Sequence, residues 1–451
     1  MELSLPFQPE DYPFSPRLRP VFSAASRRLT MIRQQKQQQK QEKQQKLRLT
    51  AAEKLKLIIC ILTLAPLKLP FYTAKYALFA LRNKLPVRPY LKCAIVRFWM
   101  GCLNARQLQC VQPGTQATYE NWARKKQKNK GKAIMSSADG QRMEPDVQPL
   151  DDDGAILWIG DRNKASKVVL FFHGGGFCAP AIPGHFEWCW NAYVQTGVEA
   201  GVEVAVAFLR YTLAPEGKFP VQLRQQVAAL KAVLDLGIGP GDIIIGGDSA
   251  GGNLVTQLLG HILHPHPAVD AVELSGPLSA AFAVSPWLFS CDPKSQTYRT
   301  NEANDMVTAS GLDQMSLAFF GNRDEMRAAE GGDNGWVAPL HVDASWFTGI
   351  TGIVSTVYVT VGLREVLLED ARGLTKRLEM AGCEVRMDEA DGEAHDFIVL
   401  EGEMGEVGDA TRRMKVAMDV VSVPSTPQPI PAQPTPLESS YPADESPRRR
   451  P

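Results

Sequence analysis

Two glycine-rich segments hold residues whose types and spacing suit attack on a carbonyl carbon. The first reads HGGGF at residues 173–177, and the second reads GDSAGG at residues 247–252. A serine flanked by glycines at a sharp strand-to-helix turn exposes its hydroxyl for nucleophilic attack. Glycines also leave their backbone N–H groups open to an approaching oxygen, because no side chain stands in the way. Together the two segments predict acyl transfer by an activated serine.

Ser249 is the predicted nucleophile because its surroundings are those of a nucleophile elbow. The apolar run DIIIGG at 242–247 precedes it like a buried strand, and NLVTQLLGHIL at 253–263 follows with a helical pattern. Acyl transfer builds negative charge on the carbonyl oxygen, and each missing donor to that oxygen costs on the order of 10²–10³ in rate. The predicted donors of this oxyanion hole are the backbone N–H groups of Gly174, Gly175 and Ala250.

A serine hydroxyl needs a general base, and the base needs an acid that orients it. His395, in DGEAHDFIVL, is the last of the seven histidines and fits the chain order serine, acid, histidine. Glu365 follows the strand-like run STVYVTVG at 355–362 and is the predicted acid. Asp370 is the second candidate, although an acid at that position also suits the first turn of the following helix.

Strand-like and helix-like segments alternate through the region that must position these residues. The β-branched and aromatic runs lie at 167–173, 203–209, 242–247 and 355–362, and the helical patterns lie at 221–236, 253–263 and 371–382. Such alternation is typical of a mostly parallel sheet with helices on both faces. The predicted fold class is therefore α/β, with Ser249 at the carboxyl edge of the sheet.

Composition divides the chain into four regions. Residues 1–56 form a basic, Gln/Lys-rich leader, which we expect to be disordered. Residues 57–133 read as an apolar anchor followed by a helical cap, and residues 134–422 read as the catalytic domain. The Pro- and Ser-rich tail at 423–451 is also expected to be disordered.

The apolar stretch 57–81 is interpreted as a membrane anchor, either a single span or an interfacial segment. Lys68 and Lys75 interrupt it, and we expect Pro66 and Pro70 to break its helix. A spanning helix needs roughly 20 predominantly apolar residues, so a buried cap helix is the alternative. We expect a membrane-associated protein, for example at the endoplasmic reticulum, with a cytoplasmic location as the alternative.

The overall composition argues against several classes of partner. The chain has 49 basic and 49 acidic residues, so its formal net charge of zero carries no nucleic-acid signature. The eight cysteines show neither metal-ligand spacing nor a short-range disulfide framework, and we expect them to be buried small side chains. The oligomeric state is left open.

The motifs in combination resemble a known family. HGGGF, RYTLAPE at 210–216, GDSAGGNL and the late HDF are similar to the hormone-sensitive-lipase-like branch of the α/β hydrolases. The leader and SPW at 285–287 resemble fungal esterases of the steryl acetyl hydrolase and arylacetamide deacetylase kind. The resemblance covers about residues 134–420 and implies an α/β-hydrolase fold with an N-terminal helical cap. It assigns the triad to Ser249, Glu365 and His395.

The resemblance also implies the reaction and its requirements. Such enzymes hydrolyse short-to-medium acyl esters, sometimes amides, and use neither a metal nor an organic cofactor. The expected partner is thus a small-molecule ester, such as an acetyl ester of a lipophilic alcohol. Lipase or amidase specificity and a non-catalytic, hydrolase-like binding protein are the alternatives.

The chain departs from the family pattern at two places. The acid loop reads Glu365, Val366, Leu367 where the family usually has D-P-L, so the acid is longer and the loop lacks its proline. Thr212 stands where the family has an arginine that we take to be structural. In GHFEWCWNAY at 184–193 the aromatic side chains either line an acyl pocket or pack the helix, and the sequence favours neither.

Overall fold

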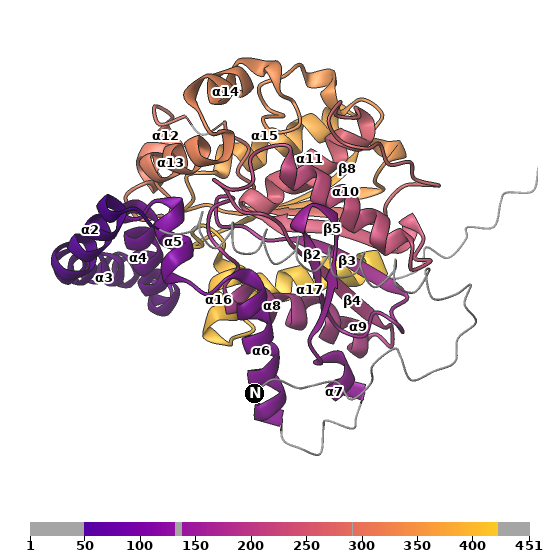
Figure 1. The fold of residues 1–451 in the computed structure, drawn as a ribbon, viewed down its shortest axis with the longest axis horizontal. Helices are drawn as coiled ribbons and strands as arrows, with labels where there is room; N and C mark the ends of the chain where they lie inside the picture. The colour runs from indigo at the N-terminus through magenta and orange to yellow at the C-terminus, as the bar shows by residue number, and fades with distance from the viewer. Residues whose placement is uncertain (1–48, 131–137, 291, 423–451) are drawn as a thin grey trace, which may run out of the picture.

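The computed structural model of this protein describes residues 49–130, 138–290 and 292–422 (Figure 1). Most of the predicted leader and the whole predicted tail therefore lie outside the described residues. The described part of the leader is partly helical, because a helix begins at Ala51, where Thr50 and Glu53 form a capping box.

A single eight-stranded sheet forms the centre of the described chain, with strand order β1-β2-β4-β3-β5-β6-β7-β8. β1 and β2 pair antiparallel, as do β2 and β4, and all other neighbours are parallel. The strands are β1 (Asp146–Pro149), β2 (Ala155–Ile159), β3 (Lys167–Phe172), β4 (Val204–Arg210), β5 (Ile243–Asp248), β6 (Ala280–Val284), β7 (Thr356–Gly362) and β8 (Glu384–Ala390). The four predicted strands correspond to β3, β4, β5 and β7.

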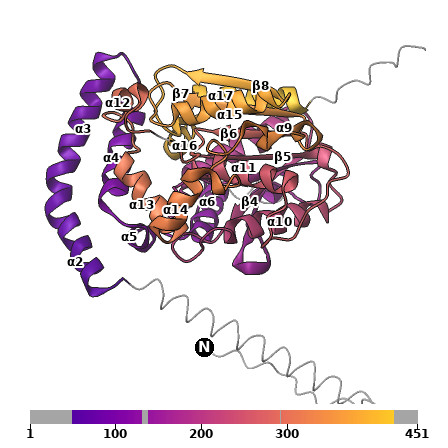
Figure 2. The same ribbon diagram turned by 90° about the horizontal axis from the view of Figure 1, so that it is seen from above.

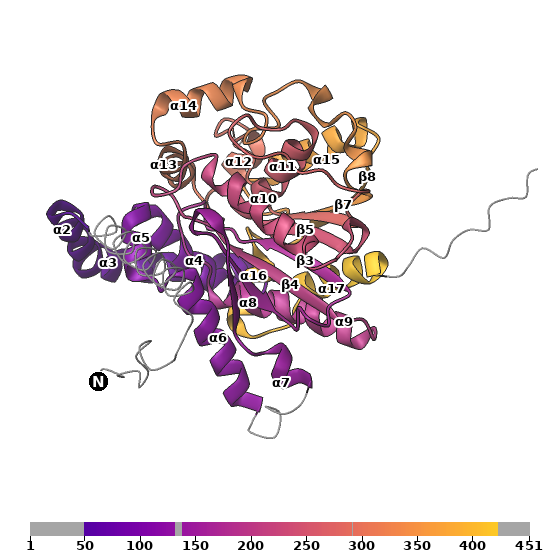
Figure 3. The same ribbon diagram turned by 45° about the vertical axis from the view of Figure 1, so that its right-hand side comes forward.

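Helices cover both faces of this sheet, as the alternating pattern predicts (Figure 3). On one face lie α10 (Val221–Leu234), α11 (Ala250–Leu263) and α15 (Leu368–Met380), and on the other lie α8 (Pro183–Cys189), α9 (Gln195–Glu199) and α17 (Asp409–Ser422). Side chains of β3 alternate between the two resulting cores: Val168, Leu170 and Phe172 join one cluster, and Val169 and Phe171 join the other. The interior strand is therefore apolar on both faces.

The N-terminal helices pack at one side of the sheet (Figure 2). Those at this side are α2 (Ala51–Ile59), α3 (Ala65–Arg82), α4 (Val87–Cys102) and α5 (Ala105–Val111). They are followed in the chain by α6 (Thr115–Lys130), which packs against α8, and by α7 (Ala138–Arg142). The remaining helices are α12 (Gln296–Asn301), α13 (Ala309–Phe320), α14 (Arg323–Ala328) and α16 (Phe397–Met404). α4 and α13 lie over the carboxyl edge of the sheet and supply residues to the pocket described below.

The expectation that prolines break the apolar stretch is wrong. Ala51–Arg82 is one continuous helix of 32 residues, long and apolar enough to cross a membrane by length and composition alone. A π-helical turn, η2 (Cys60–Leu64), immediately precedes α3, and Pro66 is the second residue of α3. Pro70 is inside α3, and the Thr73 hydroxyl donates to the Leu69 carbonyl beside it.

Candidate active site

The nucleophile elbow forms where β5 ends and α11 begins. Ser249 has φ 50° and ψ −115°, a strained backbone that turns its side chain away from both elements. Its N–H donates to the Val284 carbonyl on β6 over 2.8 Å. A Cβ at Gly251 would lie 1.9 Å from the Phe172 carbonyl oxygen, so the close approach of α11 to β3 requires glycine there. The local sequence therefore builds this turn as predicted.

Three predicted side chains meet at this turn. His395 Nε2 lies 2.9 Å from Ser249 Oγ, and His395 Nδ1 lies 3.0 Å from Glu365 Oε2. All three residues are buried. They come from the end of β5, the loop after β7 and the loop after β8, which neighbouring parallel strands bring to one edge of the sheet.

The electrostatic surroundings of His395 favour its protonated form. Burial alone lowers the pKa of His395, but the carboxylates of Asp396 and Glu365 outweigh it and raise that pKa well above its usual value. His173, by contrast, has its pKa lowered to about 3 by burial, so its imidazole is neutral at ordinary pH. The two histidines thus lie in opposite environments, and only His395 contacts the serine hydroxyl.

The hydrogen-bond partners of Glu365 and Asp370 show which of the two candidate acids contacts His395. Glu365 Oε1 accepts from the Ser285 hydroxyl at 2.7 Å, which leaves Oε2 for His395. Asp370 Oδ2 instead accepts from the Leu288 N–H at 2.6 Å, on the loop after β6. Burial raises the pKa of Asp370 to about 7. Asp370 therefore holds a loop, while Glu365 is the acid in contact with the imidazole.

The acid loop is held in place without the family's proline. The Val366 N–H, which a proline would lack, donates to Asp305 Oδ2 at 2.8 Å. Asn301 Nδ2 donates to the Glu365 carbonyl at 2.8 Å, and the His395 N–H donates to Asp305 Oδ1 at 3.4 Å. Asp305 is fully buried, and burial raises its pKa to about 6. One carboxyl group thus ties the acid loop to the base loop.

Ser285, Asn301 and Asp305 were missed as functional residues by sequence reasoning. Ser285 belongs to the SPW motif, which was noted only for its resemblance, and Asn301 and Asp305 lie in the segment at 295–306. The hydrogen-bond partners described above lie 61 to 90 residues away along the chain, from Val366 for Asp305 at 61 to His395 for Asp305 at 90. No periodicity in the sequence could reveal such contacts.

The oxyanion-hole prediction needs one correction. The Gly174 N–H donates to Asp248 Oδ2 at 3.0 Å, so it already has an acceptor, and Gly174 does not line the pocket beside Ser249. Gly175 and Gly176 do line it. Their N–H groups and that of Ala250 have no hydrogen-bond acceptor within the part of the chain that the structure describes. The sequence could not distinguish three consecutive glycines.

The RYTLAPE segment holds this glycine loop in place through hydrogen bonds. The Tyr211 hydroxyl donates to the His173 carbonyl at 2.8 Å, and the Ala214 N–H donates to the Phe177 carbonyl at 2.8 Å. Thr212, at the site of the family's arginine, is held by Gln225, which accepts from the Thr212 N–H at 2.8 Å. The structural interpretation of this motif agrees with these contacts.

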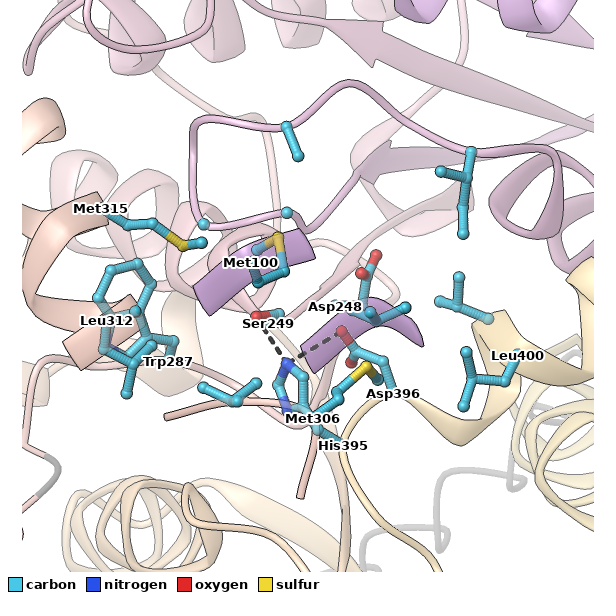
Figure 4. A pocket seen from close by; sticks show the side chains of 18 of the residues that line it. Met100, Asp248, Ser249, Trp287, Met306, Leu312, Met315, His395, Asp396 and Leu400 are labelled. Carbon is cyan, nitrogen blue, oxygen red and sulfur yellow. Dashed lines mark hydrogen bonds and ion pairs between the residues drawn. The ribbon is translucent and has the colours of Figure 1, made fainter. Parts of the chain in front are cut away.

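A pocket of about 140 Å³ lies over Ser249 and is mostly apolar (Figure 4). In that view Met315, Leu312 and Trp287 lie on one side of Ser249, and Asp396 and Leu400 lie on the other. Met100 of α4 lies above the serine, so the N-terminal helices complete the pocket wall. The arrangement can hold a small lipophilic acyl compound against a serine nucleophile.

Both interpretations of the aromatic segment at 184–193 apply, each to different residues. Trp188 and Trp190 pack in the core, Trp188 at 4.8 Å ring separation from Phe171, and neither lines the pocket. His185 does line it, with Nε2 3.2 Å from Asp248 Oδ2. Among the described residues, no group of three or more His, Cys, Asp or Glu side chains is arranged to hold a metal ion.

Comparison with known proteins identifies the family. Residues 169–399, just over half of the chain, match the family described as alpha/beta hydrolase fold. The chain is similar to an acetyl-hydrolase of Streptomyces hygroscopicus, 27% identical over 236 residues that cover 51% of this chain and 68% of that protein. It is also similar to arylacetamide deacetylase-like 2 of Homo sapiens, 31% identical over 180 residues that cover 38% of this chain and 41% of that protein.

A solved structure has the same fold. The crystal structure of a hormone-sensitive lipase from a metagenome library superposes with a TM-score of 0.50 at 20% identity, over 69% of this chain and 99% of that one. These findings confirm the predicted fold class and the predicted resemblance. The chain belongs to the alpha/beta hydrolase fold family and is similar within it to the hormone-sensitive-lipase-like esterases.

Proposed function

We propose that this chain, a carboxylic ester hydrolase, cleaves its substrates through Ser249, His395 and Glu365. The observation that carries the proposal is the continuous contact from Ser249 Oγ to His395 Nε2 at 2.9 Å and from His395 Nδ1 to Glu365 Oε2 at 3.0 Å. A protein that had kept the fold only for binding would not need this contact, which argues against the non-catalytic alternative.

In the proposed mechanism Ser249 Oγ attacks the ester carbonyl while His395 Nε2 takes its proton. Glu365 accepts the Nδ1–H, keeps the imidazole in the tautomer whose Nε2 can act as a base, and stabilises the imidazolium. The Nε2 proton then passes to the leaving alcohol. Water, activated by the same imidazole, cleaves the acyl-enzyme and regenerates the serine.

The N–H groups of Gly175, Gly176 and Ala250 are the proposed donors to the oxyanion. Ala250 begins α11, so its N–H is among those that have no acceptor within the helix. Gly176 has φ +59°, and a Cβ there would lie 2.1 Å from Met315 Sδ. Glycine at this position thus keeps the loop close to the pocket wall and free of a side chain.

The proposed substrates are short-to-medium acyl esters, such as acetyl esters, of lipophilic alcohols. The small apolar pocket supports this size range, and so do relatives named acetyl-hydrolase and ethyl acetate hydrolase. We expect kcat/KM for p-nitrophenyl esters to be highest at acetate to hexanoate and to fall steeply for palmitate. A fluorophosphonate probe should label the full chain on one serine. Preferred cleavage of palmitate, or no labelling of the folded protein, would contradict the proposal.

We also propose that the helix Ala51–Arg82 lies on a membrane surface. The expected membrane association through residues 57–81 would then be interfacial, without a span across the bilayer. One side of this helix packs on the protein: Cys60, Tyr76 and Ala80 are buried, and the Tyr76 hydroxyl donates to the Asp305 carbonyl at 2.6 Å. The other side exposes large apolar residues, which are Leu55, Ile58, Ile59, Ile61, Leu62, Leu67, Phe71, Leu78 and Leu81. If this helix spanned the membrane, its packed side would lose its contacts with the rest of the protein. A position in the membrane interface keeps these contacts and still buries the exposed apolar side chains in lipid.

This orientation can be tested with vesicles. The full chain should float with phosphatidylcholine–phosphatidylserine vesicles and be released by alkaline carbonate. The double variant Leu62→Glu/Leu67→Glu should lose at least tenfold in bound fraction, because each exposed leucine contributes about 1.5–3 kcal/mol when it is buried in lipid. Met380→Glu is the control, since Met380 is 65% exposed but lies on α15. Failure of the unmodified chain to float would support the cytoplasmic alternative, and resistance to carbonate would support a span.

A further inference from the structure

Asp396 follows the catalytic histidine, but its side chain does not have the role that its position in the fold suggests. It is the N-cap residue of α16, where an aspartate normally accepts hydrogen bonds from the first N–H groups of the helix. Here the side chain makes no capping bond, and the Asp396 backbone carbonyl accepts from the Val399 N–H at 3.0 Å instead. The left-handed backbone of Asp396, with φ 50° and ψ 42°, leaves its carboxylate outside the cap.

The carboxylate of Asp396 contacts the working nitrogen of the base (Figure 4). Its Oδ2 lies 3.1 Å from His395 Nε2, the same atom that lies 2.9 Å from Ser249 Oγ. Its Oδ1 is buried and has no hydrogen-bond partner among the described residues. Asp396 also lines the pocket, on the side of Ser249 opposite Met315 and Leu312. His395 is thus flanked by two carboxylates, Glu365 at Nδ1 and Asp396 at Nε2.

Other charged groups face this pair from each neighbouring element. Asp248 from the end of β5 and His185 from α8 lie on the pocket side, where Asp248 Oδ2 and His185 Nε2 are 3.2 Å apart. Glu365 and Asp305 lie on the far side of the imidazole, and Asp305 contacts only the His395 backbone. Burial raises the pKa of Asp396 to about 7, against the attraction of His395 and with added repulsion from Asp248. Because the two charges interact closely, the protonation of His395 and the protonation of Asp396 depend on each other.

We propose that Asp396 is a positioning residue that accepts the Nε2–H of the His395 imidazolium, so that it both stabilises the charged base during turnover and holds it protonated in the resting enzyme. This inference rests on the proposed triad. The forward step starts from the enzyme whose His395 is neutral, with a lone pair on Nε2: the Ser249 proton moves to Nε2 as Oγ bonds to the carbonyl carbon, and the carboxylate of Asp396 keeps its charge. The same proton then leaves for the alcohol oxygen when the ester C–O bond breaks.

The proposal predicts two opposite effects of one interaction. A neutral imidazole offers Asp396 only a lone pair, whereas the imidazolium offers an N–H, so the carboxylate favours the charged form alone. In the free enzyme this raises the pH at which His395 becomes a base. In the transition state it accelerates attack. Removing the carboxylate should therefore improve activity at low pH and reduce it at high pH.

The test is the pH dependence of kcat/KM for p-nitrophenyl acetate in the unmodified chain and in Asp396→Asn. Asparagine has nearly the same shape and tolerates a left-handed backbone. We expect the acid limb of the variant to move down by roughly one pH unit and its alkaline plateau to fall about tenfold. The two profiles should cross. Asp396→Gly, which also tolerates the backbone, should show the same crossing if Asp396→Asn folds poorly.

Asp391→Asn is the matched control, because Asp391 is in the same loop but its side chain is 84% exposed and pairs only at 3.9 Å with Arg364. Its profile should coincide with that of the unmodified chain. An Asp396→Asn profile that is unchanged, or lowered equally at every pH, would overturn the proposal. Fluorophosphonate labelling of Ser249 is measured in each variant and in the unmodified chain. If the proposed triad were wrong, the unmodified chain would not be labelled at Ser249, whereas failure of the Asp396 proposal alone would leave this labelling intact.

Discussion

Replacing Ser249 by alanine is expected to lower kcat for p-nitrophenyl acetate by roughly 10⁴–10⁶-fold, because the attacking oxygen is lost while the rest of the site stays in place. The measurement is steady-state kinetics at saturating substrate, with fluorophosphonate labelling in parallel. Labelling should disappear together with activity. The melting temperature should change little, since the Ser249 side chain contacts only His395 among the hydrogen-bond partners identified.

Ser316→Ala provides a matched control for this loss. Ser316 is also a buried serine, its hydroxyl donates to the Leu312 carbonyl at 2.8 Å within α13, and it does not line the pocket. Its replacement should leave kcat within a few-fold of the unmodified chain. Retention of full esterase activity by Ser249→Ala would rule out the proposed nucleophile.

Glu365→Gln is expected to reduce kcat by roughly 10³–10⁴-fold while the protein remains folded. Glu365 Oε1 accepts two donors, the Ser285 hydroxyl and the Gly362 N–H, so the amide oxygen of glutamine should take that position. The amide NH₂ would then face His395 Nδ1 and force the imidazole into the tautomer that carries its proton on Nε2. Such an imidazole cannot accept the proton of Ser249.

Asp370→Asn separates the two candidate acids. The asparagine oxygen can still accept from the Leu288 N–H, so the loop should be kept and kcat should stay within a few-fold. The comparison uses kcat together with thermal unfolding of both variants. A large loss of kcat in a folded Asp370→Asn, with little loss in Glu365→Gln, would reverse the assignment.

The sequence was sufficient to predict elements that are specified by residues close together in the chain. The elbow around Ser249 needs a buried strand, glycines and an apolar helix in immediate succession, and all three can be read within about twenty residues. Strands β3, β4, β5 and β7 were predictable because their runs of β-branched and aromatic residues are strong. The other four strands, β1, β2, β6 and β8, were missed. In β6, with the sequence AAFAV, and β8, with EVRMDEA, alanine and charged residues favour a strand only when neighbouring strands supply the pairing.

The sequence by itself determined the fold class, the serine and histidine to consider, and the presence of a glycine loop, because these depend on local pattern and chain order. Only the tertiary structure decided which acid reaches His395, which glycine N–H groups remain open, and that Asp396 shares Nε2 with Ser249. Each of these depends on distances of about 3 Å between segments far apart in the chain or on a single backbone angle, as at Asp396. Hydrogen bonding is sensitive to such differences, whereas hydrophobic pattern and residue type are not.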